Sequence, residues 1–470
     1  MDVELFTTEG LGDASYLVAS EGEAALVDPQ RDAWRFLAAA EARGWRVTRV
    51  LETHVHNDYL SGALETRAAT GAEIVAPARG GYEFPHRGAD EGTSVEVGAL
   101  RLTAMATPGH TPEHISWAIG AADAPGDGPP EGVFTGGSLL VGTAGRTDLL
   151  GDERVDELST LQRATLRRLA QLPPGVRVFP THGAGSFCSA GPAAPSRTTT
   201  IGRELARNPV LGAVESAGFR DALLGGLGRY PAYYAQMAPL NRSGPAVLGG
   251  PPRVPALDPA GIERAATDGT WIVDARPRAG FAAAHLPGAL NIELDVTFSA
   301  YVGWLLPFNA PLVLVLPEPA AAALEEAMSQ LLRIGYDRVA GYLDGGIEAW
   351  RAAGRPVSAY PTVTMDEVYA EAVAGAMPAL LDVRQPIEWR DSGVVPGART
   401  IFVADLPGRL GELPRDQRIT VACKAGSRSA IAASLLDAAG IEVRLVATGG
   451  LIGWPQRFAR LAAAERGQQR

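Results

Sequence analysis

The sequence is poor in cysteine. Of its 470 residues only two are cysteines, Cys188 and Cys423, which lie 235 positions apart. Disulfide frameworks belong mainly to small secreted proteins, so a structural disulfide is not expected here. Two thiols in a protein of this kind are either inert core residues or reactive groups, and their surroundings have to distinguish these roles.

Long apolar runs and positive charge are also lacking. No stretch approaches the roughly 20 apolar residues of a membrane helix. The N-terminal sequence MDVELFTTEGLGDASYLV has no basic start followed by an apolar stretch, so no signal peptide is expected. The net charge of −11 disfavours a basic face for nucleic acid or for an anionic membrane. We therefore expect a cytoplasmic protein without nucleic-acid or membrane partners.

The length predicts about three domains, and the patterns along the chain suggest where they lie. Residues 1 to about 200 interleave short apolar runs such as 15–20, 23–29 and 46–54 with helical stretches such as 32–44, which indicates an α/β architecture. Residues 200–250 are typical of helices and loops and end in a Gly/Pro-rich linker.

The remaining part contains an internal repeat. The segment 271–294 is similar to 379–403, and each carries an Asp-x-Arg after a buried-type strand, at Asp274 and Asp382. LDGGIEAW (343–350) recurs as ATGGLIGW (447–454), and the copies keep an offset of 104–109 positions throughout. Such a regular offset indicates two copies of one small α/β domain. We predict domains at 1–250, 251–358 and 359–470.

Histidines concentrate in the N-terminal part. THVHNDYLSG (53–62) places His54, His56 and Asp58 directly after an apolar run, where a strand that ends in a turn can direct them into one space. Imidazole and carboxylate are good ligands for first-row metals. Five of the seven histidines fall in three loops of this kind: His54 and His56, His110 and His114, and His182. This clustering predicts a metal site.

These motifs resemble those of a known fold family. HxHxD, a TPGHT loop, FTGxSL and a THG loop resemble the metallo-β-lactamase fold, an αββα sandwich with the metal at one edge of its two sheets. GRTDL (145–149) and THGAGSFC (181–188) resemble, more narrowly, the persulfide dioxygenases and their bacterial fusions to rhodanese domains. The resemblance covers the whole chain. It implies one Fe(II) per chain, held by two histidines and one aspartate, with positions open for persulfide and dioxygen.

Two positions depart from that family. The resemblance assigns the histidine ligands to His54 and His110 and the aspartate to position 137, which is glycine here. His56, Asp58 or water would then have to complete the site, because losing a ligand weakens metal binding. Tyr59 stands where two-metal hydrolases of this fold have histidine, which argues against a two-zinc hydrolase. Either an altered iron site oxidises persulfides, or the domain holds zinc or no metal and only binds persulfide.

Three further residues are candidates for this pocket, and His182 and Tyr59 are expected around it. Cys188 lies in a loop of small residues, which would give it access; it either relays sulfur near the metal or is a buried, inert thiol. Arg146 and Asp148 in GRTDL either brace their loop or, through Arg146, meet an anionic substrate.

The last domain contains a second candidate site. ITVACKAGSRSAIAASLLDAAG (419–440) indicates a buried strand that ends at Cys423, a tight loop and a helix. The loop turns backbone N–H groups inward as an anion-binding nest, and the helix N-terminus and Arg428 add positive charge. All three favour a thiolate that takes up sulfur and passes it on. The loop residues that would hold a persulfide are Lys424, Ala425, Gly426 and Ser427.

This loop resembles the rhodanese active-site loop CxxGxRS in full. Only four residues separate Cys423 from Arg428, which is one fewer than in the similar phosphatase loop and suits sulfur better than phosphate. The first copy has Leu316 at the equivalent position, with no thiol, nest or arginine, so we expect a packing or docking module in which Asp274 and His285 are structural.

The sequence thus favours an enzyme that oxidises low-molecular-weight persulfides at a mononuclear metal site and transfers sulfane sulfur through Cys423 to thiol, sulfite or thiosulfate. The alternative is a sulfurtransferase, carrier or sensor whose N-terminal domain has lost its metal. A metallohydrolase with accessory rhodanese domains is a third possibility. Members of this family often form dimers or tetramers, so we expect a homo-oligomer.

Overall fold

The structure is a computed structural model that describes residues 2–124, 128–183, 185–189 and 196–468. The chain divides into two compact units. The first contains residues 1–252 together with 329–335, and the second contains residues 253–328 and 336–470. In the part of the chain that the structure describes, no helix combines the length and the apolar character that crossing a membrane requires.

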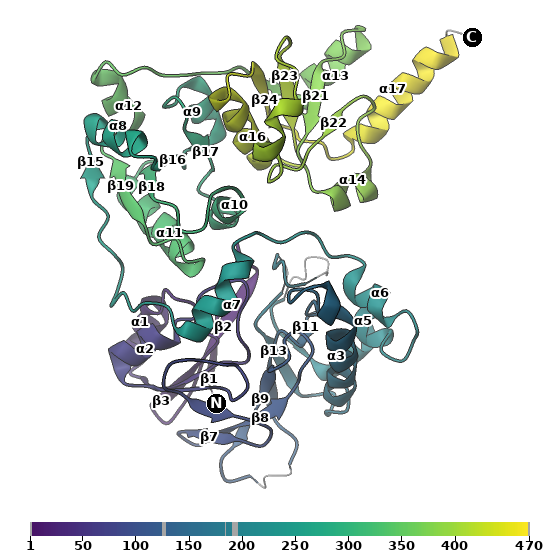
Figure 1. The fold of residues 1–470 in the computed structure, drawn as a ribbon. Coiled ribbons are helices and arrows are strands. Elements are labelled where there is room, and N and C mark those ends of the chain that lie inside the picture. The colour runs from purple at the N-terminus through teal and green to yellow at the C-terminus, as the bar shows by residue number, and fades with distance from the viewer. Residues whose placement is uncertain (1, 125–127, 184, 190–195, 469–470) are drawn as a thin grey trace. The chain divides into compact units, whose positions relative to one another are not determined.

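Two six-stranded sheets form the centre of the first unit (Figure 1). The first sheet runs in the order β1-β2-β3-β4-β5-β6 and the second in the order β14-β13-β10-β9-β8-β7. The strands are β1 (Asp2–Thr8), β2 (Asp13–Ser20), β3 (Glu23–Val27), β4 (Arg46–Leu51), β5 (Glu73–Pro77), β6 (Arg87–Ala89), β7 (Ser94–Val97), β8 (Leu100–Ala106), β9 (Ile115–Ala121), β10 (Gly132–Gly136), β13 (Arg177–Pro180) and β14 (Thr199–Thr200), with a small hairpin of β11 (Leu139–Leu140) and β12 (Thr143–Ala144).

The sheets face each other across an apolar core, and helices cover their outer faces. Tyr16, Trp117 and Phe134 belong to the core that both sheets share. A second cluster joins the other face of the first sheet to the helices through Phe36, and a third joins the second sheet to its helices through Leu166. The helices are α1 (Trp34–Ala42), α2 (Ala63–Thr70), α3 (Val155–Leu169), α4 (Ile201–Arg207), α5 (Pro209–Gly212), α6 (Phe219–Leu224) and α7 (Tyr234–Ser243), with a 3₁₀ turn at Asp152–Arg154. This αββα layering confirms the predicted fold of the domain.

The second unit contains two similar parallel sheets. Their orders are β15-β19-β18-β16-β17 and β20-β24-β23-β21-β22, and all pairings within them are parallel. The strands are β15 (Ala256–Leu257), β16 (Trp271–Asp274), β17 (Leu290–Asn291), β18 (Leu312–Val315), β19 (Val339–Leu343), β20 (Thr362–Thr364), β21 (Ala379–Asp382), β22 (Arg399–Thr400), β23 (Ile419–Ala422) and β24 (Val443–Thr448). The shared strand order confirms that the sequence repeat is a structural repeat.

Helices connect the parallel strands, as crossovers between such strands require. In the first copy they are α8 (Pro259–Thr267), α9 (Arg278–Ala283), α10 (Phe298–Leu305), α11 (Ala320–Arg333) and α12 (Gly346–Ala352). In the second they are α13 (Met365–Val373), α14 (Pro386–Ser392), α15 (Leu406–Arg409), a 3₁₀ turn at Leu410–Glu412, α16 (Ser427–Ala438) and α17 (Trp454–Gln468). The central strands β18 and β23 are fully buried, so their continuous apolar runs fit strands that are covered on both faces.

Candidate functional site

Three histidines from three different loops meet at one edge of the two sheets. His54 follows β4, His110 lies in the loop between β8 and β9, and His182 follows β13. The Nε2 atoms of His54 and His182 are 3.3 Å apart, and the His110 ring centroid lies 5.0 and 5.2 Å from those of His54 and His182. The ligand atoms of all three lie within 4.8 Å of one another. The structure thereby assembles a three-imidazole cluster from residues up to 128 positions apart.

The second ring nitrogen of each of these histidines already has a partner. His54 Nδ1 contacts Thr53 Oγ1 at 2.8 Å, and Thr53 in turn donates to Asp28 Oδ2. His110 Nδ1 contacts the Arg146 carbonyl at 2.8 Å, and His182 Nδ1 contacts Asp13 Oδ1 at 2.8 Å. Acceptors at Nδ1 place the ring proton there and leave the Nε2 lone pairs for the cluster. This arrangement is the usual support for metal-binding histidines.

The cluster fits a metal ion. Two nitrogens at about 2.0–2.1 Å from one tetrahedral ion lie about 3.3 Å apart, which matches the separation of His54 and His182. His110 Nε2 is buried and has no hydrogen-bond partner among the described residues, and such orphaned atoms in native proteins call for an explanation. Asp58 Oδ1 is likewise buried without a partner among them. Imidazole donors of this kind suit zinc or iron.

Protonation in the metal-free cluster follows the local charges. Burial and the neighbouring histidines lower the pKa of His54 well below its usual value, and burial lowers that of His110 to about 3. Burial also opposes the charged form of His182, but Asp58 and Asp13 outweigh it and raise the pKa of His182 to about 10. Without a metal, the protonated Nε2 of His182 therefore donates a hydrogen bond to Nε2 of His54. The proton takes the place between the two nitrogens that a metal ion would occupy.

His56 remains a candidate ligand through its other ring nitrogen. Its Nε2 lies 3.0 Å from Glu52 and 3.4 Å from Asp28, whereas its buried Nδ1 has no hydrogen-bond partner among the described residues. His56 forms one possible metal-binding group with Asp58 and His182 and another with Asp28 and His54. Burial opposes the charged form of His56, yet the carboxylates of Glu52 and Asp28 raise its pKa well above the usual value. Tyr59 stacks on this ring at 4.3 Å and its hydroxyl lies 3.2 Å from Nε2, so its phenol fills the space beside His56.

Gly137 lies directly against His110. A Cβ at position 137 would be 2.2 Å from His110 Cδ2 and 2.8 Å from Nε2. The imidazole therefore occupies the space that an aspartate side chain would need, so the departure from the family sequence is matched by a different packing. Gly137 N also donates to His114 Nε2 at 2.9 Å, which commits His114 to a structural bond.

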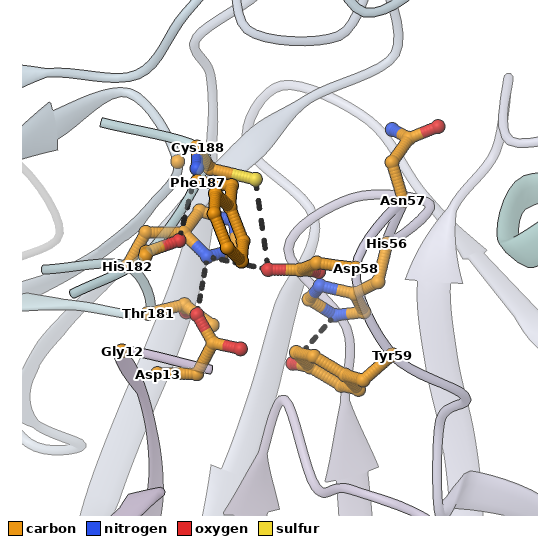
Figure 2. Close-up of polar contacts among 12 residues, drawn as sticks. Gly12, Asp13, His56, Asn57, Asp58, Tyr59, Thr181, His182, Phe187 and Cys188 are labelled. Carbon is orange, nitrogen blue, oxygen red and sulfur yellow. Dashed lines mark hydrogen bonds and ion pairs between the residues drawn. The ribbon is translucent and has the colours of Figure 1, made fainter. Parts of the chain in front are cut away.

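Cys188 is buried rather than accessible, which corrects the expectation drawn from its small-residue loop. The residue is fully shielded from solvent, and its Sγ donates to Asp58 Oδ2 at 3.6 Å (Figure 2). The same carboxylate oxygen lies 3.1 Å from His182 Nδ1. Burial, together with Asp58 and Asp13, raises the pKa of the Cys188 thiol well above its usual value. The thiol lies beside the histidine cluster, in an environment that disfavours a thiolate.

Arg146 and Asp148 brace the loop that carries them. Arg146 forms a two-point ion pair with Asp148, at 2.5 and 2.7 Å. It also donates to the carbonyls of Phe187 and Gly228, and its guanidinium lies 4.7 Å from the ring centroid of Tyr230. These contacts favour the bracing role over binding of an anionic substrate.

The supporting residues of this site carried no motif. Asp13 and Asp28 each fix the orientation of a histidine from positions far along the chain. On α7, Asn241 donates to the carbonyls of His56 and Tyr59 and accepts from the Ser61 amide. Its neighbour Tyr233 donates to the Asp58 carbonyl at 3.0 Å. Only their pairing with loop backbone groups in three dimensions marks these residues as functional.

Cys423 follows β23 in the second unit and begins a tight loop into α16. The Gly426 amide donates to Cys423 Sγ at 3.0 Å, and Cys423 is 2% exposed. Gly426 has φ 111°, a backbone conformation that glycine adopts readily. Lys424 and Ala425 are exposed, and Ser427 begins the helix. The loop therefore directs an amide and a helix N-terminus towards the sulfur.

Arg428 differs in one respect from the expected free cation. It forms a two-point ion pair with Glu388 of α14, with Nη2 to Oε1 at 2.9 Å and a second bond from Nη1 to Oε2. The side chains of Arg428 and Glu388 are 12% and 24% exposed. Its charge is thus shared with a carboxylate that the motif does not include.

The first copy preserves the fold without the thiol. Its Asp274 and Arg276 form the same two-point pair as Asp382 and Arg384 in the second copy. Leu316 is buried where the second copy has Cys423. His285, expected to be structural, contacts Asp437 of α16 at 3.1 Å.

Comparison with known proteins agrees with one N-terminal domain followed by two repeated domains. Residues 9–182 match the metallo-beta-lactamase superfamily, and residues 259–353 and 364–456 match the rhodanese-like domain. A hydroxyacylglutathione hydrolase of Cereibacter sphaeroides is 33% identical over 187 residues, which cover 39% of this chain and 67% of that protein.

Two solved structures are similar to parts of the chain. The metallo-beta-lactamase from Staphylococcus aureus subsp. aureus COL has a TM-score of 0.64 and 28% identity, and the match covers 73% of this chain and 98% of that one. ETHE1 from Myxococcus xanthus has 27% identity and a TM-score of 0.44, over 52% of this chain and 99% of that one. The chain belongs to the metallo-beta-lactamase superfamily and carries two rhodanese-like domains after its metallo-beta-lactamase domain.

Proposed function

We propose that the protein is an enzyme of sulfur metabolism that transfers sulfane sulfur through Cys423 and oxidises a low-molecular-weight persulfide at a single metal in its first unit. The observation that carries the proposal is the Gly426 amide, 3.0 Å from Cys423 Sγ at the start of α16. A sulfur held by such a donor and by the helix N-terminus is stabilised as an anion.

The transfer step follows from this geometry. The Cys423 thiolate attacks the outer sulfur of thiosulfate, the sulfur–sulfur bond breaks, and sulfite leaves with the bonding electron pair. The persulfide that forms on Cys423 carries its negative charge on the terminal sulfur, where the loop amides can stabilise it. The thiolate of an acceptor then attacks that sulfur, which regenerates the Cys423 thiolate and releases a new persulfide.

In the first unit, His54, His110 and His182 would hold the metal, which we propose to be Fe(II). A bound iron supplies the redox chemistry by which persulfide, dioxygen and water give thiol, sulfite and two protons. The protein's contribution is a set of buried ligands whose orientations are fixed by hydrogen bonds. Asp28 and Asp13 fix the histidine orientations, and the buried Asp58 carboxylate, with one unpartnered oxygen, offers a further ligand atom beside His182.

Hydrolysis of a glutathione thioester is the second candidate. It is favoured by the 33% identity to a protein named hydroxyacylglutathione hydrolase. Two side-chain positions argue against a two-metal hydrolase. Gly137 offers no carboxylate to bridge two metals. Tyr59 stands where such enzymes have a histidine ligand, and its hydroxyl contacts His56 Nε2 at 3.2 Å. A third outcome is a first unit without metal that binds persulfide and consumes no oxygen.

The deciding experiment compares three reactions in one preparation reconstituted with iron: oxygen uptake with glutathione persulfide, thiosulfate-to-thiol transfer, and hydrolysis of a hydroxyacylglutathione. We expect the first two reactions. His110→Ala should abolish oxygen uptake and leave transfer, whereas Cys423→Ser should do the reverse. Thioester hydrolysis with zinc, without oxygen uptake, would replace the oxidation proposal by the hydrolase. Transfer that survives in Cys423→Ser would refute the sulfurtransferase assignment.

A further inference from the structure

The cysteine-less first copy reaches into the loop of the second. Arg278, the first residue of α9, donates from Nη1 to the Ala425 carbonyl at 2.9 Å. The approach is close: a Cβ on Gly426 would lie 1.5 Å from Arg278 Nη1. Both copies belong to the same compact unit. The guanidinium therefore packs against Ala425 and Gly426 in the loop that follows Cys423.

The bonded carbonyl and the sulfur-binding amide belong to one peptide group. The Ala425 carbonyl accepts from Arg278, and the next atom along the chain, Gly426 N, donates to Cys423 Sγ. A trans peptide is planar and directs its C=O and N–H to opposite sides. A cation on the oxygen side therefore fixes the plane that aims the N–H at the sulfur. It also draws electron density towards the oxygen, and hydrogen bonds in a chain strengthen one another in this way.

Arg278 is itself held in position. Its Nη2 lies 2.6 Å from Glu293 Oε2, and its backbone amide donates to Glu293 Oε1 at 2.8 Å. The two side chains are 20% and 13% exposed, so solvent screens the pair only in part.

Other contacts join the first rhodanese-like copy to α16 of the second copy. Ser434 of α16 accepts from the Asn291 amide at 3.0 Å, and Asp437 of α16 contacts His285 at 3.1 Å. Tyr301 of α10 is partly buried and lies close enough to Arg428, Cys423 and Glu388 for their charges to influence its pKa, although desolvation is the main cause of its rise. The first copy thus lies along the helix whose N-terminus faces the sulfur.

We infer that Arg278 is a positioning residue of the sulfurtransfer site, and that the first rhodanese-like domain completes that site by orienting and polarising the 425–426 peptide. This role rests on the sulfurtransferase function proposed for Cys423. It replaces the expectation of a mere packing module with a defined contribution to the reactivity of the thiol.

The test uses the full-length protein in a Cys188→Ser background, so that ultraviolet thiolate absorbance reports on Cys423 alone. Arg278→Met keeps the aliphatic length and removes the donor and the charge. We expect its thiolate absorbance to develop at higher pH and its kcat/KM for thiosulfate to fall about tenfold, as for loss of one charge-assisted hydrogen bond. Arg278→Lys should recover part of both. Arg351→Ala, an exposed arginine of α12, is the matched control and should change neither.

A wild-type titration and transfer rate in Arg278→Met would overturn the inference. If that variant does not fold, Arg278→Gln decides, because its polar side chain removes the charge and shortens the reach towards the Ala425 carbonyl; a thiolate titration like the wild type's would then overturn the inference. Absence of thiosulfate transfer in the unmutated protein would refute the proposed function instead. The absorbance titration does not depend on turnover, so the two failures are distinguishable.

Discussion

Substitution of Gly137 tests the packing of the histidine cluster most directly. A side chain there would begin 2.2 Å from His110 Cδ2, whereas non-bonded carbons rest about 3.5–4.0 Å apart. The ring would have to move by about 1 Å or more, and metal–ligand distances tolerate only about 0.2 Å. Its retreat is limited because its Nδ1 is bonded to the Arg146 carbonyl at 2.8 Å.

We therefore expect Gly137→Ala to weaken metal binding about ten- to a hundredfold, the usual consequence of misplacing a ligand. Overpacking should also destabilise the metal-free protein by about 1–3 kcal/mol. Gly137→Asp makes the same collision but supplies a carboxylate, so at best it exchanges one ligand for another. It should bind no tighter than the unmutated protein.

The assay is competition with a metal-buffering chelator, followed by elemental analysis and by thermal unfolding of the metal-free proteins. Gly120→Ala is the control, because a Cβ there meets nothing within 4 Å. Tighter iron binding by Gly137→Asp, or unchanged binding by Gly137→Ala, would refute the argument that the His110 ring fills this space.

Two further predictions concern the thiol and the ion pair. Cys188 should resist iodoacetamide in the native protein and react once denaturant is added, because burial raises the pKa of its thiol; labelling of Cys188 in the native state, detected by peptide mass spectrometry, would contradict its burial. Glu388→Gln should destabilise the protein by about 1–3 kcal/mol at neutral pH, because it leaves the partly buried Arg428 without its carboxylate. Burial alone would raise the pKa of Glu388, but Arg428 outweighs it and lowers that pKa below 4.5. The pair therefore stabilises the fold fully above pH 4.5, and its contribution is lost as the pH falls through the lowered pKa. Unfolding midpoints of the two proteins should converge in acid, and a difference that is constant with pH would show that the pair is not the cause.

The local patterns of the sequence predicted most of the architecture. Alternating strands and helices, the loop histidines and the offset between Asp274 and Asp382 each depend on short segments, and these are the signals that periodicity and turn chemistry carry. The roles of individual side chains were less predictable. Which ring nitrogen each histidine leaves for a metal depends on Glu52 beside His56 Nε2 and on Asp13 beside His182 Nδ1, and Asp13 lies 169 positions from His182.

Contacts between distant elements have no local pattern. Arg278 lies 147 positions from Ala425, and nothing in the sequence around α9 distinguishes it from a surface arginine. The burial of Cys188 likewise follows from tertiary packing, which overrides the flexibility that its small neighbours suggest.

The bonds made by α7 have a consequence for where the first domain ends as a working module. The match to the superfamily's sequence model ends at residue 182, yet Asn241 and Tyr233 hold the backbone of the loop that carries Asp58 and Tyr59. A chain cut after the region of similarity would keep the histidines of the cluster and lose the scaffold of the wall beside them. The smallest fragment that keeps the surroundings of the histidine cluster therefore extends at least through Ser243, the last residue of α7, so part of the segment that joins the domains supports the candidate site.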